Sequence, residues 1–281
     1  ERIEMATLYL VGTPIGNLGD ITFRAIETLK NVDFIACEDT RVTKKLCHHY
    51  DIQTLLKSYH EHNKAQQTDY LISLLTEGHD VALVSDAGLP LISDPGYELV
   101  VEAHQYDIQV ETVPGPNAGL TALMASGLPS YTYTFLGFLP RKDKDKVDVL
   151  QERMYQDSTL IIYESPFRVV ETLKAIIKVD SNRRIAIGRE LTKKFEQIVM
   201  REATTLLDAL QDGDIPQKGE FVILIEGAQP LETEQWFESL SIIEHVNHYI
   251  SEQDLKPKKA IKLVAEERHM KTGEVYDIYH E

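Results

Sequence analysis

The segment Glu38–Arg41 (EDTR) carries side chains that could transfer a proton and bind an anion. Asp39 offers a carboxylate, which can accept a proton from a hydroxyl group. Arg41 offers a guanidinium, which can bind a phosphate through two parallel hydrogen bonds. A structural role is also open, in which Asp39 or Thr40 caps a helix and an ion pair forms at the surface.

The segment Tyr163–Arg168 (YESPFR) combines the same two kinds of group. Glu164 is a second candidate proton acceptor, and Arg168 is a second candidate phosphate ligand. Here too a structural interpretation is available, because Ser165 could cap a helix that Pro166 starts. Both roles can hold at once.

Three loops rich in small residues follow predicted strands, namely 11–20 (VGTPIGNLGD), 85–96 (SDAGLPLISDPG) and 113–119 (VPGPNAG). Loops at the carboxyl ends of parallel strands are where open α/β sheets bind ligands, and small residues let a ligand approach the backbone. The first loop lacks the G-x-G-x-x-G spacing, and Pro14 removes an N–H that a phosphate cradle would use. The loops therefore favour a ligand other than a nucleoside triphosphate, with an ordinary tight turn as the alternative for the first loop.

Two stretches concentrate positive charge, although each could also be an ordinary solvated helix face. Such local charge is what binding to a nucleic acid requires, whatever the total charge of the chain. The first stretch, interrupted by Asp143 and Asp145, holds Arg141, Lys142, Lys144 and Lys146, and the second holds Lys256, Lys258, Lys259 and Lys262.

Histidines and cysteines are also present, but their spacing matches no known pattern of metal ligands. We expect no metal site. The residues concerned are Cys37, Cys47, His48, His49, His60 and His62.

The elements that must position these groups alternate regularly in the first part of the chain. Such alternation predicts a mostly parallel sheet covered by helices. Asp20 is placed to cap the first helix. We expect strands over 8–11, 32–37, 55–59, 81–85 and 110–113, and helices over 21–31, 42–49, 65–76 and 97–104.

A second α/β region follows the breaker Pro114-Gly115-Pro116. From about Pro230 the strand character is lost, and we expect a helical appendage in which Trp236 is a packing anchor. The domains predicted are 5–115, 116–229 and 230–281, and residues 1–4, before Met5, are expected to lie outside the fold. Expected strands are 132–138, 160–163, 185–187 and 221–225, and expected helices are 118–126, 146–155 and 166–177.

Composition sets the broad class of protein. The 281 residues are 43% hydrophobic and 26% charged, as in ordinary globular proteins. No apolar run approaches the roughly 18–20 residues of a membrane-spanning helix. Two cysteines are too few for a disulfide scaffold and fit a reducing compartment. With 45 acidic and 29 basic residues, the net charge of −16 favours solubility. We expect a cytoplasmic protein.

Taken together, the motifs VGTPIGNLGDIT, ACEDTR, VSDAGLPLISDPG, VPGPNA, YESPFR and GRELTKKFE resemble the tetrapyrrole-methylase fold family over about residues 6–228. The motifs ACEDTR and YESPFR resemble the branch that methylates the 2′-hydroxyl of a cytidine ribose in the decoding region of small-subunit (16S) ribosomal RNA. The resemblance implies two α/β domains with a cofactor cleft between them, a small C-terminal helical tail and a homodimer.

The same resemblance implies the cofactor S-adenosyl-L-methionine and assigns candidate residues to it. The acids Asp39 and Glu164 become the candidate catalytic residues. The RNA would contact Arg41, Arg168, Arg141, Lys142, Lys258 and Lys259. The implied cofactor-binding residues are Pro14, Asp86, Ala87, Gly88, Leu91, Ser93, Asn117, Ala118, Tyr163 and Leu191.

Other functions remain open on the sequence. A methylase of corrins or of diphthamide would share the fold, a non-catalytic relative could bind RNA, and a nicotinamide-dependent oxidoreductase would use similar loops. Transfer of a labelled methyl group to small ribosomal subunits distinguishes an RNA methyltransferase from a corrin or diphthamide methylase and from a non-catalytic relative. Cofactor titration distinguishes it from an oxidoreductase.

Overall fold

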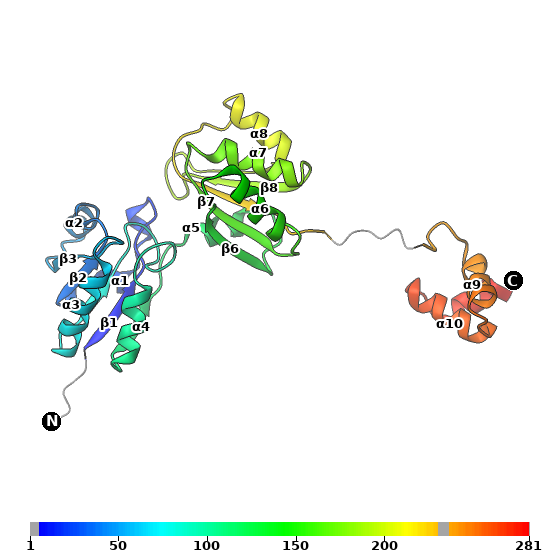
Figure 1. Cartoon of the computed structure of the whole chain (residues 1–281), viewed down its shortest axis with the longest axis horizontal. Helices are drawn as coiled ribbons and strands as arrows, with labels where there is room; N and C mark the ends of the chain where they lie inside the picture. The colour runs from blue at the N-terminus through cyan, green and yellow to red at the C-terminus, as the bar shows by residue number, and fades with distance from the viewer. Residues whose placement is uncertain (1–5, 230–235, 281) are drawn as a thin grey trace. The chain divides into compact units, whose positions relative to one another are not determined.

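The structure, a computed structural model, describes residues 6–229 and 236–280 and divides the chain into two compact units, 1–228 and 229–281 (Figure 1). Residues 1–4, expected outside the fold, are not among the described residues. Unit 1 holds two five-stranded sheets, and unit 2 is helical. None of the helices in the described ranges is long and apolar enough to cross a membrane.

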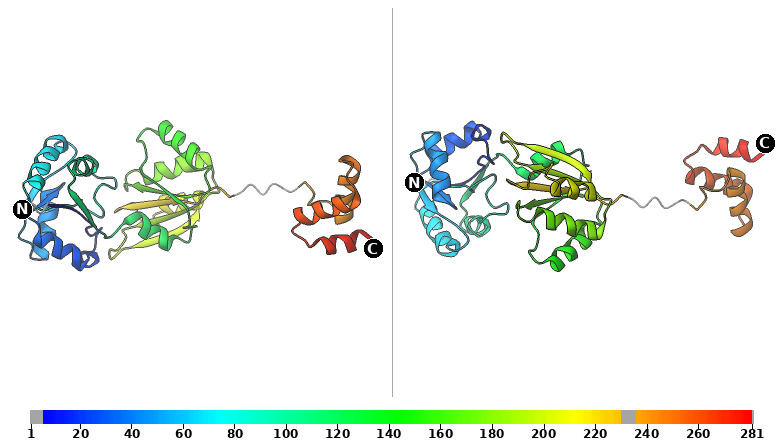
Figure 2. Two further views of the ribbon diagram at one scale, coloured as in Figure 1. Left: turned by 90° about the horizontal axis from the view of Figure 1, so that it is seen from below. Right: turned by 90° about the horizontal axis from the view of Figure 1, so that it is seen from above.

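The first sheet of unit 1 is fully parallel, with the strand order β3-β2-β4-β1-β5. Helices cover both faces (Figure 2), which is why a central strand such as β4 is buried along its whole length. Leu29 of α1 and Leu46 of α2 pack on one face, and Leu71 of α3 and Leu99 of α4 pack on the other. The elements are β1 (Thr7–Val11), α1 (Phe23–Asn31), β2 (Phe34–Cys37), α2 (Thr40–His49), β3 (Leu55–Ser58), α3 (Lys64–Thr76), β4 (Val81–Leu83), α4 (Tyr97–Gln105) and β5 (Gln109–Val113).

The second sheet is mixed, with the order β6-β7-β10-β8-β9. Strands β6 and β7 are parallel, whereas β10 is antiparallel to both β7 and β8, and β8 is antiparallel to β9. Leu123 of α5 packs on one face, and Leu150, Leu173 and Leu206 of α6, α7 and α8 pack on the other. The elements are α5 (Ala118–Ser126), β6 (Tyr133–Phe138), α6 (Asp143–Arg153), β7 (Thr159–Glu164), α7 (Val169–Val179), β8 (Arg184–Arg189), β9 (Gln197–Glu202), α8 (Ala203–Gln211) and β10 (Phe221–Ile225).

The predicted fold class is confirmed, but the predicted cap of the first helix is wrong. Asp20 ends a short 3-10 helix (Leu18–Asp20), and Thr22 caps α1 instead. The Thr22 hydroxyl accepts a hydrogen bond from the Ala25 N–H at 3.0 Å. Thr22 holds this position because it directly precedes the first helical residue in an extended conformation.

The predicted start of α7 at Pro166 is also wrong. The helix begins at Val169, and Ser165 does not cap it with its side chain. Instead, the Ser165 carbonyl accepts the N–H groups of Arg168 and Val169, each at 3.1 Å. These bonds form a turn over residues 165–168 that separates the end of β7 from the helix.

Two elements of the second sheet were not predicted. Strand β9 lies at the sheet edge, and its burial does not alternate between successive residues, so it lacks the usual period of two. Helix α8 buries Ala203, Leu206, Ala209 and Leu210, a helical spacing that the sequence does contain. The sequence pattern of β9 is therefore a weak signal for a strand, whereas the pattern of α8 is a clear signal for a helix that the prediction missed.

Unit 2 is helical, as predicted for the C-terminal appendage, and contains α9 (Ile242–Glu252), α10 (Pro257–Glu267) and α11 (Thr272–His280). Val246, Ile261 and Val275, one from each helix, are buried in its core. Ser241 and Glu244 form a reciprocal capping box at the start of α9. Trp236, the predicted packing anchor, contacts the rings of His245 and His248, with centroids 5.0 and 4.3 Å apart, although the residue is 47% exposed.

The domain boundaries remain a prediction. Strand β5 ends at Val113 and α5 starts at Ala118, so the first sheet precedes the Pro114–Pro116 loop and the second sheet follows it. The structure places both sheets within one compact unit, and the division into 5–115, 116–229 and 230–281 is finer than the two units it shows.

The three glycine-rich loops are clamped together by backbone contacts. The Gly12 N–H donates to the Val113 carbonyl at 3.0 Å, and a Cβ at Gly12 would lie 2.7 Å from the Gly115 Cα. Thr13 and Gly88 exchange two backbone hydrogen bonds, of 2.9 and 3.1 Å. The loops after β1, β4 and β5 are therefore held as one surface at the carboxyl ends of the strands.

We expect Gly12→Ala to destabilise unit 1 by about 1–3 kcal/mol, because the new methyl group would overlap the backbone of the neighbouring loop. Thermal unfolding should show a midpoint lowered by roughly 5 °C. Gly273→Ala is the control, since a Cβ at Gly273 would meet no atom within 4 Å. Equal midpoints for the two variants would contradict the clamp.

Candidate functional site

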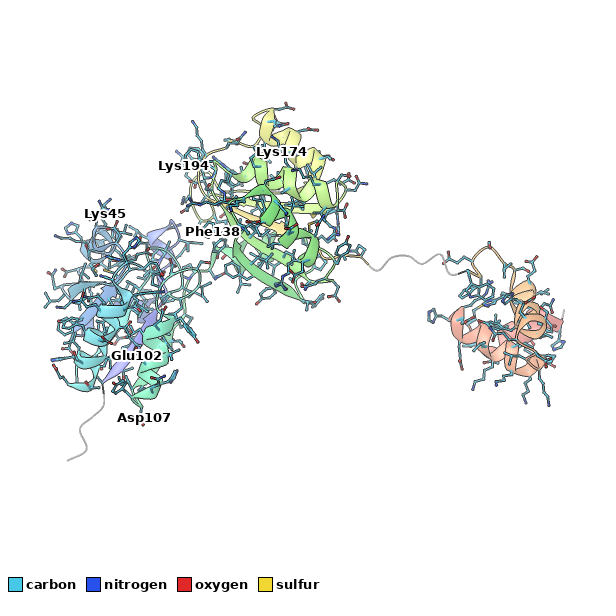
Figure 3. All side chains as sticks on the ribbon, in the orientation of Figure 1. Lys45, Glu102, Asp107, Phe138, Lys174 and Lys194 are labelled. Carbon is cyan, nitrogen blue, oxygen red and sulfur yellow. The ribbon has the colours of Figure 1, made fainter. Side chains whose placement is uncertain are left out.

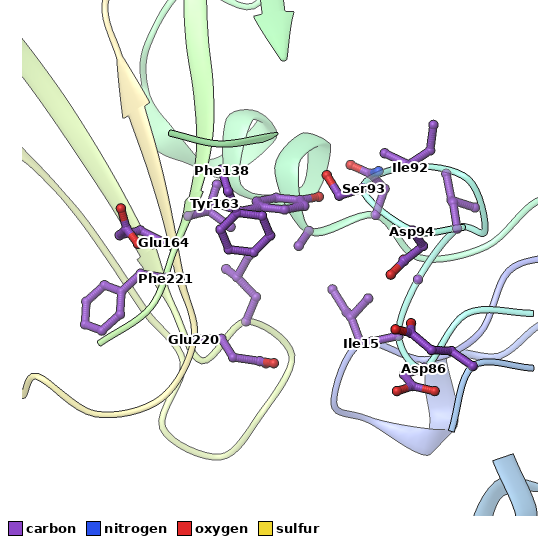
Figure 4. Close-up of a pocket in the computed structure, with 18 residues that line it drawn as sticks. Ile15, Asp86, Ile92, Ser93, Asp94, Phe138, Tyr163, Glu164, Glu220 and Phe221 are labelled. Atoms are coloured by element: carbon purple, nitrogen blue, oxygen red, sulfur yellow. The ribbon is translucent and has the colours of Figure 1, made fainter. Parts of the chain in front are cut away.

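A cavity of about 330 Å³ lies in unit 1 where the clamped loops of the first sheet meet the second sheet (Figure 4). Asn17 Nδ2 donates to the Thr192 carbonyl at 3.2 Å, so the loop after β1 also contacts the loop after β8. The cavity is lined by Ile15, Glu38, Asp86, Ala87, Gly88, Leu89, Ile92, Ser93, Asp94, Asn117, Ala118, Phe138, Tyr163, Glu164, Leu191, Glu220, Phe221 and Val222.

Most of the residues that the sequence assigned to a cofactor line this cavity, although their roles remain predictions. Pro14 and Leu91 do not line it. Pro14 lies next to Ile15, which does, and Leu91 packs against the backbone of Gly96. The lining residues that were predicted are Asp86, Ala87, Gly88, Ser93, Asn117, Ala118, Tyr163 and Leu191.

The loop after β4 holds several residues in the left-handed region. Gly88 has φ +83°, and Leu91 and Ser93 have φ +68° and +64°. Glycine adopts this conformation freely, whereas for Leu91 and Ser93 it is strained. Strain of this kind persists where the surrounding structure imposes it, and it concentrates at ligand-binding loops.

Acids dominate the charge of the cavity. Among the lining residues, all within the described part of the chain, there is no lysine, arginine or histidine, but there are Glu38, Asp86, Asp94, Glu164 and Glu220. Burial, together with the nearby carboxylates of Glu38 and Asp86, raises the pKa of Asp94 to about 6. Burial and the Asp86 carboxylate likewise raise the pKa of Glu38. This lining favours a ligand that carries positive charge.

An aromatic wall faces Asp86 and Asp94. Figure 4 shows Phe138 and Tyr163 on one side of the cavity and Asp86 and Asp94 on the other. The ring of Tyr163 meets those of Phe135 and Phe138 edge-on, with centroids 5.0 and 6.0 Å apart. The Tyr163 hydroxyl accepts the Gly119 N–H at 3.2 Å, and burial raises the pKa of this hydroxyl. The wall is apolar and fixed in orientation.

Glu164 lines the cavity with its carboxylate already engaged. One oxygen accepts the Ser165 N–H at 2.9 Å, and the other accepts the Thr172 hydroxyl at 2.7 Å. The Arg168 Nε lies 3.6 Å from the first oxygen. The side chain is 1% exposed, so these partners compensate for its burial.

Asp39 does not line the cavity and has the structural role that the sequence also allowed. Its carboxylate caps α2 and binds the exposed Arg41 guanidinium through contacts of 3.0 and 2.7 Å. These bonds to Arg41 lower the pKa of Asp39 to about 2. The Asp39 N–H donates to Asp86 Oδ1 at 3.0 Å, so the backbone of the EDTR segment helps to position a carboxylate that lines the cavity.

The remaining predicted RNA contacts fall into two places. Arg141 and Arg168 line a second hollow, next to the cavity, and Lys142 immediately precedes α6. Lys258 and Lys259 are exposed in the first turn of α10, in unit 2. No cluster of three or more metal-ligating side chains was found in residues 6–229 and 236–280.

Several lining residues were not predicted as site residues. Glu38 and Asp94 belong to the motifs ACEDTR and VSDAGLPLISDPG, so their presence in ligand-binding segments was a usable signal. Phe138 and the segment 220–222 reach the cavity only through the pairing of the second sheet, which the sequence does not reveal.

Comparison with known proteins agrees with this architecture. The sequence model of the family described as tetrapyrrole (corrin/porphyrin) methylases matches residues 7–207. Proteins named ribosomal RNA small subunit methyltransferase I are 50% identical in Halalkalibacterium halodurans (100% of this chain, 97% of the relative) and 48% identical in Bacillus subtilis (99% and 96%). A structure of uroporphyrin-III C-methyltransferase from Thermus thermophilus, complexed with S-adenyl homocysteine, has a TM-score of 0.55 and 18% identity, covering 79% of this chain and 97% of its own.

We expect Asp94→Asn to stabilise the protein more at pH 8 than at pH 5. A carboxyl group whose pKa rises on folding to about 6 favours the folded state while protonated, and this contribution is lost as the pH rises through about 6. Allowing for solvent screening, the gain at pH 8 should be about 1 kcal/mol. Thermal unfolding at both pH values measures it. The exposed Asp107→Asn is the control, and a gain for Asp94→Asn that is the same at both pH values would contradict the interpretation.

Proposed function

Because the chain belongs to the tetrapyrrole methylase family, we propose that it transfers a methyl group from S-adenosyl-L-methionine to small-subunit ribosomal RNA. Identity of about 50% along the whole chain to proteins named for that activity carries the choice of substrate. The acid-lined cavity supports the choice of cofactor. The proposed acceptor is the 2′-hydroxyl of a cytidine ribose in the decoding region, as the motifs ACEDTR and YESPFR imply.

The chemistry of the cavity fits this cofactor. S-adenosylmethionine carries a sulfonium and an ammonium group, and the carboxylates of Asp86 and Asp94 can stabilise positive charge. A nicotinamide dinucleotide would bring phosphates into a site lined by acids. Pro14 also provides no N–H to hold a phosphate.

The residues proposed to hold the cofactor are Asp86, Ala87, Gly88, Ser93, Asn117, Ala118, Tyr163 and Leu191, with Pro14 and Leu91 supporting the loops. When bound, the cofactor supplies a methyl group that a nucleophilic oxygen can take in an in-line displacement. The chain's own contribution is alignment of the acceptor and exclusion of water by the aromatic wall.

A ribose hydroxyl becomes a good nucleophile only as its proton is removed. Asp39 and Glu164 are the proposed acceptors of this proton. Glu164 lines the cavity, whereas Asp39 lies outside it and, with a pKa of about 2, is a weak base. We therefore favour Glu164 for this role.

Positive side chains are proposed to bind the RNA. Within unit 1 these are Arg41, Arg141, Lys142 and Arg168. Within unit 2 they are Lys258 and Lys259. We further propose that the protein acts in the cytoplasm as a homodimer, the assembly that the family resemblance implies.

The decisive experiment is transfer of a tritiated methyl group from S-adenosylmethionine to small ribosomal subunits that lack the modification. We expect transfer by the wild-type protein and none by Ala118→Trp, whose indole would fill the cofactor volume. Ala65→Trp, at an exposed position on α3, is the matched control. Calorimetry should show that only Ala118→Trp loses cofactor binding. Wild-type cofactor affinity in a folded Ala118→Trp variant would refute the site.

Reversal of charge in unit 2 tests its part in RNA binding. We expect Lys258→Glu with Lys259→Glu to weaken RNA binding and to flatten its dependence on salt by a slope of about 1 to 2, because two phosphate contacts are lost. Cofactor affinity should not change. Lys174→Glu with Lys178→Glu, on the surface of α7, is the charge-matched control. RNA affinity equal to that of the control across a salt series would exclude unit 2 from the RNA interface.

A further inference from the structure

A second hollow adjoins the cavity and differs from it in charge. It is formed by the end of β6 and the following residues, 138–141, together with Glu164, Ser165 and Arg168, and we call it the arginine hollow. Phe138 and Glu164 line both the hollow and the cavity. The two spaces therefore share a wall. The cavity is lined by acids and no basic residue, whereas the hollow holds two guanidinium groups and the shared Glu164.

We propose that the arginine hollow is the subsite for the acceptor nucleotide, with Phe138 against the base and Arg141 on a neighbouring phosphate. This inference rests on the proposed function and specifies where the RNA enters the site. A nucleotide seated there would bring its ribose to the shared wall, beside Glu164.

Phe138 is suited to stack on a base. Phe138 is 59% exposed although it belongs to a strand, and Figure 3 labels it on the part of unit 1 that holds the second sheet. The rings of Tyr163 and Phe138 meet edge to face, which fixes the orientation of Phe138 while more than half of the residue stays exposed. Exposed aromatic rings of this kind bind unstacked bases in single-stranded RNA.

A bulge in β6 puts Phe138 in this place. Phe135 pairs with Ile161, but Gly137 pairs with Ile162 and Phe138 with Tyr163, so one extra residue is inserted between Phe135 and Gly137. Without it, the alternation of the strand would turn Phe138 to the opposite face from Phe135. Bulges re-aim side chains near functional sites, and Gly137 provides the φ of +63° found here.

The two arginines of the hollow have different roles: Arg168 holds the surrounding backbone in place, and the guanidinium of Arg141 is available to bind a ligand. Arg168 Nη2 donates to the carbonyls of Leu139 and Pro140 at 3.0 and 3.2 Å, which ties the end of β6 to the turn after β7. Glu164, 3.6 Å away, offsets the charge of Arg168. Arg141 is exposed and forms no hydrogen bond or ion pair with any residue in the described ranges, so its guanidinium can bind a phosphate.

Phe138→Ala and Arg141→Ala test the proposal in the full-length protein. We expect each to raise the KM for small-subunit RNA about tenfold, through loss of a stacked base or of a phosphate contact. The Kd for S-adenosylmethionine should stay at the wild-type value in Arg141→Ala, because Arg141 lines the hollow but not the cavity. Phe138→Tyr should restore the KM, because a tyrosine ring also stacks. Phe23→Ala, at a position 94% exposed on α1, and Arg201→Ala, exposed on β9, are the matched controls.

A binding measurement separates failure of this inference from failure of the proposed function. Fluorescence anisotropy with a labelled single-stranded RNA that carries the target cytidine needs no methyl transfer. Weaker binding by Phe138→Ala than by Phe23→Ala supports the subsite even if the wild-type protein transfers no methyl group, a result that would refute only the proposed function. Equal RNA affinities and equal KM values for the variants and their controls overturn the subsite.

Discussion

The close approach of Gly12 to Gly115 is the contact on which the site depends. Since no side chain fits between these backbones, the loops after β1 and β5 lie directly against each other. The bridge between Thr13 and Gly88 then adds the loop after β4. Parallel strands bring their carboxyl ends to one edge of a sheet, but only this clamp turns three separate loops into the floor of a single cavity.

The same floor holds features that weaken the folded state. Leu91 and Ser93 have left-handed backbone conformations, and Asp94 is a buried carboxyl group beside Glu38 and Asp86. Each of these costs free energy in the absence of a ligand. A bound cation would relieve the repulsion among the carboxylates, so ligand binding and stability are coupled through Asp94 in particular. The cost is concentrated where the proposed cofactor binds.

The first sheet was largely predictable from the sequence, because strands such as β4 are short apolar runs between amphipathic helices. The loops that line the cavity were predictable too, since glycine and proline mark them. Local pattern could not reveal the pairing of the second sheet, in which β10 inserts between β7 and β8. Local pattern could not separate the spatial roles of Asp39 and Glu164 either. They occur in similar motifs, yet Asp39 caps α2 and binds the exposed Arg41, whereas Glu164 is buried in the cavity wall.

Strand register connects the sequence of the second sheet to its chemistry. Phe138, Tyr163 and Val222 are register partners on three adjacent strands, and all three line the cavity. The next register pair, Glu164 with Phe221, is the last pair between β7 and β10, before the chain turns toward α7. A single bulged residue in β6 decides whether an aromatic ring or Gly137 lies beside Tyr163. The inserted residue thus places Phe138, one of the two residues shared by the cavity and the arginine hollow, and hydrophobic alternation along β6 does not predict it.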